Sequence, residues 1–463
     1  MKNPESSVPG TSAQLAAFIA DLKFDDVPKD VIEGLKLNIL DGIGCCLVGA
    51  TLPWTRMCAD MVMADGGAPM ATVIGMGHTA PLSGAVLINA TAGHAFELDD
   101  IHRDSILHPN SIAVPVALNT SEFLGGASGR DILTAIVAGY ETGTRIGAAA
   151  GTDLLLRGFH PQGVIGPFTA AATAAWLMKL DTNTTLHALG IAGSLGSGLM
   201  AAQEGAMVKR LHSGHAAEAG VRGALLARSG FTGISDVVEA GYGGFLAAFS
   251  GKVELARVTD GLGETWETAS TGFKPHATVT SIHAALDALG LIMSAHDLSA
   301  GDIAEIHAGI SKPTHVHCAW PYAAQGITAA QMNIYYGLAT IALRGRAFVD
   351  AFTEDAIHDP QTLAFMDKIS AGIDPEIEAK GPAYRHMARV RVATNDGRTF
   401  EKTVEHRKGS PDNPLSADEV ETKYRALAGS VLSEKDTARV RELVFGLDTA
   451  SEVESLISAI SGR

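Results

Sequence analysis

The residues best suited to chemistry gather in one polar stretch, Asn89–Pro109. Its ionisable side chains are His94, Glu97, Asp99, Asp100, His102, Arg103, Asp104 and His108. Imidazoles beside carboxylates are the groups that enzymes use most for general acid and base catalysis near neutral pH. On a helix, Glu97 would share a face with Gly93 and Asp100. We therefore expect this stretch to form one wall of a pocket.

A second cluster gathers positive charge. Lys209, Arg210, His212 and His215 follow one another closely in a chain whose formal net charge is −16. Lysine and arginine hold carboxylates through charge-assisted hydrogen bonds. Burial shifts the pKa of a lysine or histidine toward values suited to acid/base catalysis. This cluster predicts a binding site for a carboxylate substrate.

Two further segments place a histidine or lysine beside an expected structural border. His160 lies in a loop between two apolar helical segments, with Gly158 and Pro161 around it. Lys274 and His276 stand where the helical character of the chain ends. Loops on rigid scaffolds and borders between domains are common places for functional residues.

The elements that must position these groups are mostly helical up to about residue 271. Residues 28–46 carry apolar side chains at a helical period, and Ser128 with Asp131 has the spacing of a helix-starting capping box. Small residues recur inside the helices, as in 170–175, and small side chains let helices approach closely. Residues 1–271 therefore predict a large helical domain.

Strand patterns appear after Thr271. Apolar residues alternate in 303–311, and 387–404 holds two alternating runs around Asn395-Asp396-Gly397, which predicts a hairpin. Helices resume after about residue 405, with a capping box at Ser416 and Glu419. The predicted fold class is mainly α: a large all-helical domain (1–271 and 405–463) with a smaller inserted α+β lid domain (272–404).

The amino-acid composition limits the kinds of partner that we expect the protein to bind. The chain of 463 residues has 35 Lys and Arg against 51 Asp and Glu, which argues against a nucleic-acid partner. A content of 46% apolar and 19% charged residues suggests that a second subunit covers part of the surface. The four cysteines lack zinc-ligand spacing, and we find no signal or membrane-spanning segment. We expect a soluble cytoplasmic homodimer without a membrane partner.

Five segments, in this order, resemble the MmgE/PrpD family. They are GHAFELDDIHRDSILHPNS, AGYETGTRI, GFHPQGVIGPFTAAATAA, KRLHSGHAAEAGVRGALLARSGFTG and KPHATVTSIHAALDA. The family includes 2-methylcitrate dehydratases, cis-aconitate decarboxylases and iminodisuccinate epimerases. The resemblance implies a homodimeric enzyme with a helical domain and an α+β lid, and a reaction that needs no cofactor or metal.

The resemblance also implies roles for single residues. His108, His160 and Lys209 stand where the family places pocket residues, and Lys274 stands at its lid lysine. Three positions depart from the family pattern: Glu97 replaces an aspartate, Ile101 replaces a common threonine, and Val279 stands where cis-aconitate decarboxylases carry a lid histidine. Loss of a hydroxyl and an imidazole changes which proton transfers a pocket can perform. These departures favour dehydration over decarboxylation.

We therefore expect a cofactor-independent lyase on a small polycarboxylic acid, with a 2-methylcitrate dehydratase-like reaction first. An epimerase, isomerase or decarboxylase of a small di- or tricarboxylate is the alternative. The expected catalytic residues are His108, His160, Lys209, Asp99 and Asp100. The expected substrate-binding residues are Glu97, His102, Arg103, Arg210, His212, Lys274 and His276. In this scheme the cations hold carboxylates, the histidines exchange protons, and Asp99 or Asp100 orients an imidazole.

Two other hypotheses remain open. His94 and Glu97, with His102 and His108, could form a metal shell, although no HExxH or HxH pair is present. The chain could also be a carboxylate-binding or assembly protein that kept the fold and lost the chemistry.

Overall fold

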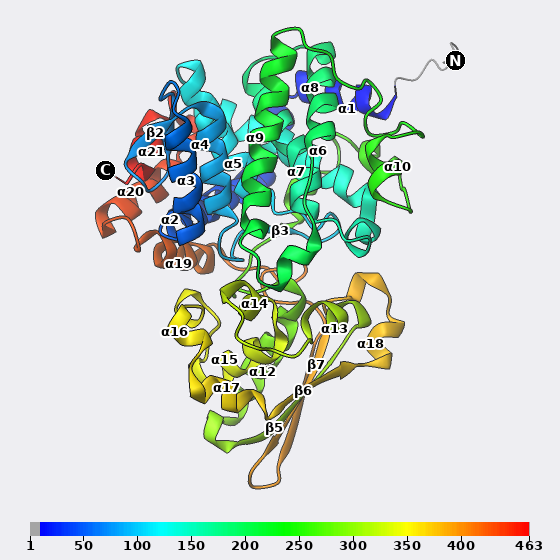
Figure 1. The fold of residues 1–463 in the computed structure, drawn as a ribbon, viewed down its shortest axis with the longest axis vertical. Helices are drawn as coiled ribbons and strands as arrows, with labels where there is room; N and C mark the ends of the chain where they lie inside the picture. The colour runs from blue at the N-terminus through cyan, green and yellow to red at the C-terminus, as the bar shows by residue number, and fades with distance from the viewer. Residues whose placement is uncertain (1–9, 463) are drawn as a thin grey trace.

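The computed structural model describes residues 10–462, which form a helical body and a smaller lobe below it (Figure 1). The body contains helices α1 (Thr11–Asp21), α2 (Lys29–Ala50), α3 (Pro53–Asp65), α4 (Leu82–Gly93), α5 (Asn110–Leu124), α6 (Gly129–Leu156), α7 (Pro161–Leu177), α8 (Thr182–Leu195), α9 (Val208–Arg228), α10 (Phe245–Phe249) and α11 (Ala256–Thr259). After the lobe, the chain returns to the body as α19 (Ala417–Ala428), α20 (Glu434–Phe445) and α21 (Glu454–Ile460). The prediction of a mainly α protein is confirmed.

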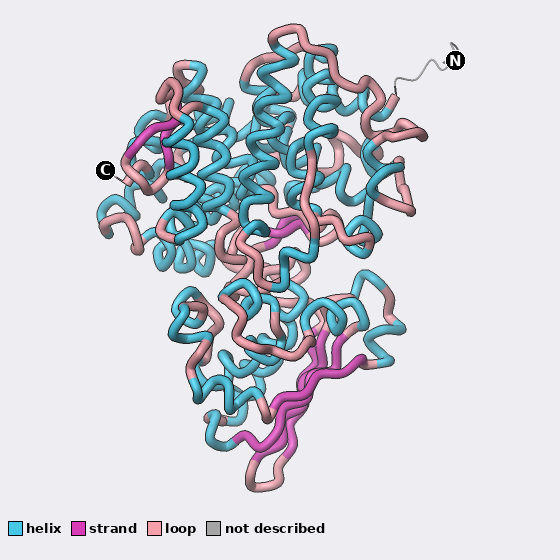
Figure 2. The backbone as a smooth tube through the Cα atoms, in the orientation of Figure 1, coloured by secondary structure: helices cyan, strands magenta, loops and turns pink. Residues whose placement is uncertain are grey.

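The lobe combines helices with the largest sheet of the described residues (Figure 2). Its strands β5 (Ile303–Ile310), β6 (Ile369–Ile373), β7 (Ala388–Thr394) and β8 (Thr399–Val404) lie in the order β6-β5-β7-β8. Only β5 and β6 are parallel, and α12 (His283–His296) packs on β7 and β8. The other helices are α13 (Lys312–Cys318), α14 (Ile327–Met332), α15 (Ile334–Arg344), α16 (Glu354–Ile357), α17 (Pro360–Met366) and α18 (Pro375–Ala379).

Two short antiparallel pairs complete the strands. One joins β1 (Ala71–Val73) to β2 (His78–Ala80) within the body. The other joins β3 (Ile101–His102) to β4 (Thr271–Gly272), where the chain passes from the body to the lobe. The body is therefore helical with one small hairpin, and β3 fixes the reactive stretch against the junction.

The body has an apolar core of its own, and the core of the lobe extends to a few body residues such as Val48 and Leu427. One core unites Leu35 of α2 with Tyr424 and Val440 of the C-terminal helices, and another unites Ile306 and Val390 of the lobe sheet. On this packing we propose the division into a discontinuous helical domain and an inserted α+β domain. The homodimer and the cytoplasmic location stay predictions. Between residues 10 and 462, no helix combines the length and apolar character needed to cross a bilayer.

Local sequence signals predicted several elements correctly. The hairpin is β7–β8, the strand at 303–311 is β5, and Ser128 and Ser416 both begin helices through capping boxes. The expected helix through Glu97 is wrong. Helix α4 ends at Gly93, and Glu97 takes a left-handed backbone conformation with φ of 57°. Partners far away in the sequence bind this polar segment, so local helix propensity does not decide its backbone.

The small residues of α7 and α9 let these helices pack at close range. A Cβ built on Gly220 of α9 would lie 2.4 Å from both the Ala170 Cβ and the Pro167 carbonyl oxygen. Ordinary carbon contacts need far more space, and helix backbones cannot move apart without opening the core. This contact positions α9, which carries Lys209 and Arg210 at its first turn.

We predict that Gly220→Ala destabilises the protein by about 1–3 kcal/mol through overpacking. Urea unfolding followed by circular dichroism measures the change. Gly34→Ala in α2 is the control, because a Cβ there has nothing within 4 Å. Relief of glycine backbone entropy should make that variant more stable by about 0.4–1 kcal/mol. Equal stability of the two variants would contradict the close-packing argument.

Candidate active site

A buried carboxylate at the junction is held by three cations. Glu97 accepts from Arg210 Nη1 at 2.5 Å and from Lys274 Nζ at 3.1 Å, and it also pairs with Lys209. The four residues are at most 4% exposed. Lys209 and Arg210 come from the first turn of α9, whereas Lys274 lies on the segment that leads into the lobe. The cluster therefore joins three separated segments of the chain.

The charged groups of this cluster shift one another's pKa values. Burial alone would raise the pKa of Glu97, but Lys209, Lys274 and Arg210 together hold that pKa well below its usual range. Burial lowers the pKa of Lys209 to about 8, although attraction to Glu97 opposes the shift. Glu97 is therefore ionised at neutral pH, while Lys209 can lose or regain a proton near it.

The lobe completes the cluster from below. Arg210 Nη2 donates to Gln331 Oε1 at 2.7 Å, and Gln331 Nε2 donates to the Phe96 carbonyl at 2.9 Å. Gln331 lies in α14 and is buried. The amide thus links the loop of Glu97 with α9 across the junction. Nothing in the composition or periodicity around Gln331 marked it in the sequence.

Four imidazoles lie next to the charged cluster. The ring centre of His94 lies 5.0 Å from that of His108 and 5.7 Å from that of His160. The His160 ring centre is 5.0 Å from that of His212, and their Nδ1 atoms lie 2.9 Å apart, so one of them donates to the other. The structure therefore gathers histidines from the α4–α5 connection, the start of α7 and α9.

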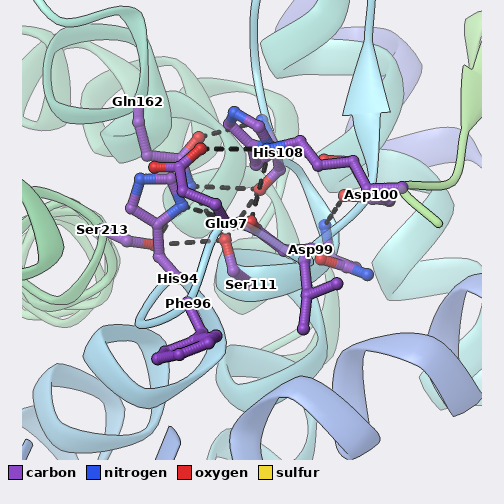
Figure 3. A network of polar contacts seen from close by, with 12 residues as sticks. His94, Phe96, Glu97, Asp99, Asp100, His108, Ser111, Gln162 and Ser213 are labelled. Atoms are coloured by element: carbon purple, nitrogen blue, oxygen red, sulfur yellow. Dashed lines mark hydrogen bonds and ion pairs between the residues drawn. The ribbon is translucent and has the colours of Figure 1, made fainter. Parts of the chain in front are cut away.

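Asp99 ties two of these rings together (Figure 3). Its Oδ2 lies 2.7 Å from His94 Nδ1, and its Oδ1 lies 3.6 Å from His108 Nδ1. His108 Nδ1 also lies 2.5 Å from the Asp100 carbonyl oxygen, which can only accept. Both rings therefore carry their proton on Nδ1 and leave Nε2 available, and His94 Nε2 is buried without a partner among the described residues.

The imidazoles are neutral at pH 7. Burial is the largest cause in each case, and it lowers the pKa of His108 to about 3 and that of His212 to about 4. The pKa of His160 is lowered well below its usual range, and that of His94 is lowered although Asp99 opposes the shift. Neutral rings can accept protons, and a bound anion would make protonation easier.

Asp100 has a different role from the one we expected. Its carboxyl group accepts from Tyr140 Oη at 2.7 Å, from Asn38 Nδ2 at 3.1 Å and from the Asn110 backbone N–H at 3.0 Å. Its backbone carbonyl, rather than its carboxyl group, orients His108. Asp99 is the carboxylate that lies beside the imidazoles.

A hydrogen-bonded amide fixes the backbone of His108. Gln162 Oε1 accepts from the His108 backbone N–H at 2.9 Å, and Gln162 Nε2 donates to the His108 carbonyl at 3.1 Å. The same Nε2 donates to Ser111 Oγ and to Ser213 Oγ, each at 3.0 Å. Figure 3 shows these side chains gathered around Gln162. The sequence suggested His94 only as a possible metal ligand, and it did not suggest Gln162, Ser111 or Ser213 as site residues. Of these last three residues, only Gln162 could have been suspected from the sequence, because it lies two residues after His160.

Three expected binding residues lie outside this cluster. His102 contacts Ser105 and Glu267, each at 2.9 Å. His276 Nε2 pairs with Asp287 at 3.1 Å. Arg103 is partly exposed and pairs with Asp104 and Asp412. Spacing in the sequence suggested His102 and Arg103, but β3 turns the chain after Asp100 and both side chains find other partners. His276 was suggested by the domain border, and Asp287 holds its ring instead.

The metal shell suggested by the sequence does not assemble. Glu97 faces the cations and His102 faces Glu267. A different trio, His94, Asp99 and His108, places its ligand atoms within 4.8 Å of one another. The ring nitrogens of that trio that face Asp99 and the Asp100 carbonyl already have hydrogen-bond partners. These hydrogen bonds explain why the three side chains lie together, and we interpret the trio as an acid/base network.

Both halves of the chain match known families. Residues 13–257 match the MmgE/PrpD N-terminal domain, and residues 276–449 match the MmgE/PrpD C-terminal domain. A cis-aconitate decarboxylase-like protein of Aspergillus oryzae is 35% identical over 99% of this chain and 98% of its own length. Cis-aconitate decarboxylases of Aspergillus terreus and Homo sapiens are 32% and 27% identical, over 98% and 96% of this chain and 96% and 94% of their own lengths.

We predict that Glu97→Gln lowers the free energy of unfolding at pH 7 by about 3–5 kcal/mol, because three buried cations lose their anion. Since the pKa of Glu97 is depressed in the folded protein, its contribution is fully present above the ordinary value of 4.5 and declines as the pH falls below it. Urea unfolding from pH 7 down to pH 4 tests both statements.

The matched control is Glu376→Gln. Glu376 pairs with Arg389 but its side chain is 76% exposed, so its loss should change stability by less than about 1 kcal/mol. If the difference between wild type and Glu97→Gln did not shrink below pH 4.5, the cluster would not depend on an ionised Glu97.

Proposed function

The chain belongs to the MmgE/PrpD family, and from this premise we propose that it is a lyase that decarboxylates a small unsaturated polycarboxylic acid of the cis-aconitate type. One observation carries the proposal: three buried cations surround Glu97, and four neutral imidazoles lie close enough that, after burial, Lys209 or Lys274 lowers the pKa of each ring. The cations suit the carboxylates that remain on the substrate, and the imidazoles suit proton transfer to carbon. The names of the relatives support decarboxylation among the family reactions.

The reaction needs charge stabilisation and one proton. The bond between the substrate carbon and the departing carboxylate breaks, CO₂ leaves, and the electron pair spreads over the alkene and a neighbouring carboxylate. Lys209 and Lys274 stabilise this negative charge from a preorganised, water-poor site. A proton from the protein then reaches the distant alkene carbon, and solvent returns that proton to the site.

His108 is our assignment for the proton donor. Its Nδ1–H is held by the Asp100 carbonyl, so its Nε2 can bind a proton and face substrate. Asp99 lies 3.6 Å away and stabilises the resulting imidazolium. Burial keeps the ring neutral in the protein alone, so the carboxylates of the substrate must raise its pKa. Substrate binding therefore charges the acid that the reaction needs.

Dehydration is the second candidate, and the His160–His212 pair favours it. Loss of water requires one group that removes a proton from carbon and another that protonates the leaving hydroxyl. The two rings share a hydrogen bond between Nδ1 atoms and can exchange a proton with each other. The departures at Ile101 and Val279 placed this reaction first in the sequence analysis, whereas the relatives support decarboxylation.

We predict that the purified protein converts cis-aconitate into a dicarboxylate that is one carbon shorter, with equimolar CO₂. Proton NMR in D₂O with cis-aconitate, citrate, 2-methylcitrate and iminodisuccinate tests this. Alkene formation from 2-methylcitrate without CO₂ would indicate dehydration, and deuterium exchange without net change would indicate epimerisation. Binding without turnover would favour the non-catalytic hypothesis. Activity should survive exhaustive chelation.

We predict that His108→Asn and Lys209→Ala each lower kcat for the active substrate by about 10²-fold or more, because one removes the proton donor and the other a stabilising cation. Steady-state kinetics measures the effect. His358→Asn is the control, since His358 is exposed on the lobe and bonds only to the Glu354 carbonyl among the described residues. Near-normal turnover in both site variants would remove the assignment.

A further inference from the structure

We propose that a second anion-binding site, for one carboxylate- or phosphate-sized oxyanion, lies at the junction between Arg103 and Arg407, with Arg385 adjoining it. This site goes beyond the proposed reaction and does not depend on it. It is built from the connection after β3, the turn before β7 and the segment after β8. It therefore draws its cations from both the body and the lobe.

Two of these guanidinium groups lack a carboxylate partner. Arg407 is only 5% exposed, and its Nη1 donates to the carbonyls of Phe273 at 2.7 Å and Lys408 at 3.2 Å. Arg385 Nη2 donates to the Arg103 carbonyl at 2.6 Å. Within residues 10–462, neither arginine has a carboxylate oxygen within 4.0 Å. Main-chain carbonyls satisfy single N–H groups but leave the positive charge unbalanced.

Such an arrangement is costly without an anion. Buried charges are normally paired, because desolvation of an ion costs several kcal/mol and opposite charge must offset it. Burial lowers the pKa of both Arg385 and Arg407 to about 10, although Asp104 opposes the shift of Arg385 and Asp287 opposes that of Arg407. Burial and these arginines also lower the pKa of the neighbouring His386 well below the usual range. Among the described residues, no carboxylate forms an ion pair with Arg385 or Arg407.

A small cavity lies among these groups. It has room of about 30 Å³ and is lined by Arg103, Arg407, His386 and Ser410, among others. Ser410 is 8% exposed, and its Oγ is buried with no partner among the described residues. An unpaired buried hydroxyl beside unpaired guanidinium N–H groups is a donor set for an oxyanion.

The carboxylates at the rim do not fill this role. Glu405 pairs with Lys380 at 3.3 Å, and its side chain is 43% exposed. Asp412 lies 3.3 Å from Arg103 and 3.4 Å from His406, with 46% of its side chain exposed. Both line the cavity but are partly exposed and pair with other cations, whereas Arg407 is only 5% exposed and pairs with neither.

The cavity size limits the ligand. A water molecule needs roughly 10–15 Å³ by the same measure, so about 30 Å³ holds a single carboxylate or phosphate group and excludes a whole tricarboxylic acid. The cavity also shares no residue with the Glu97 cluster or the four imidazoles. We therefore treat it as a site separate from the candidate active site.

The test uses the full chain and thermal unfolding at pH 7 and constant ionic strength, with inorganic phosphate or acetate replacing chloride. Wild type should show a saturable rise in Tm. Arg407→Gln and Arg103→Gln should each weaken the apparent affinity by about tenfold or more, because each removes a charged hydrogen-bond donor that lines the cavity. Arg103 is 39% exposed, so its variant should fold even if Arg407→Gln does not.

Two controls make the result specific. Arg346→Gln removes the same charge from an arginine that is 66% exposed and pairs with Asp350, and it should leave the response unchanged. Lys209→Ala should also keep the response, whereas its loss there would place the anion at the Glu97 cluster and overturn the proposal. Saturation by acetate at lower concentration identifies a carboxylate ligand, and the reverse identifies phosphate. No saturable response in wild type, or a response as strong as that of wild type in both junction variants, would also overturn the proposal.

Discussion

The charge balance around Glu97 determines how the body and the lobe meet. One carboxylate compensates Lys209, Arg210 and Lys274, which come from two parts of the chain. Each cation alone would be costly to bury, so the three segments are stable together only when Glu97 reaches all of them. The left-handed backbone at Glu97 gives its side chain that reach, at a cost of order 1–3 kcal/mol.

This balance also separates the two chemical functions of the site. The cations are charged because Glu97 is ionised, whereas the imidazoles stay neutral because burial and the nearby cations disfavour a further positive charge. A substrate with several carboxylates reverses the second condition. In the reaction that we propose, it adds negative charge beside His108 and His160, so the protein acquires its acid when the substrate arrives. On this proposal, selectivity for polyanions and readiness for catalysis have one electrostatic origin.

The sequence predicted the parts of this structure that depend on local patterns. Turn residues at Asn395-Asp396-Gly397 and capping pairs such as Ser416 with Glu419 specify their elements within a few residues. Prediction from the sequence failed where contacts with residues far away in the chain determine the local structure. Glu97 leaves the helix because α9 and the junction supply its cations, and Gln162 becomes a support of His108 only after α7 packs beside that loop. Spacing alone grouped His102 and Arg103 with the site, although β3 directs both away from it.

The junction also relates the candidate active site to the proposed anion site. Phe273 donates its N–H to the Gly409 carbonyl at 2.7 Å, and its own carbonyl accepts from Arg407 at 2.7 Å. The next residue is Lys274, whose ammonium group binds Glu97. An anion that fixes Arg407 would therefore hold the backbone from which Lys274 extends, and so the cation that faces the substrate. Both crossings of the chain between body and lobe meet at this point, which makes it the place where domain contact and active-site geometry are coupled.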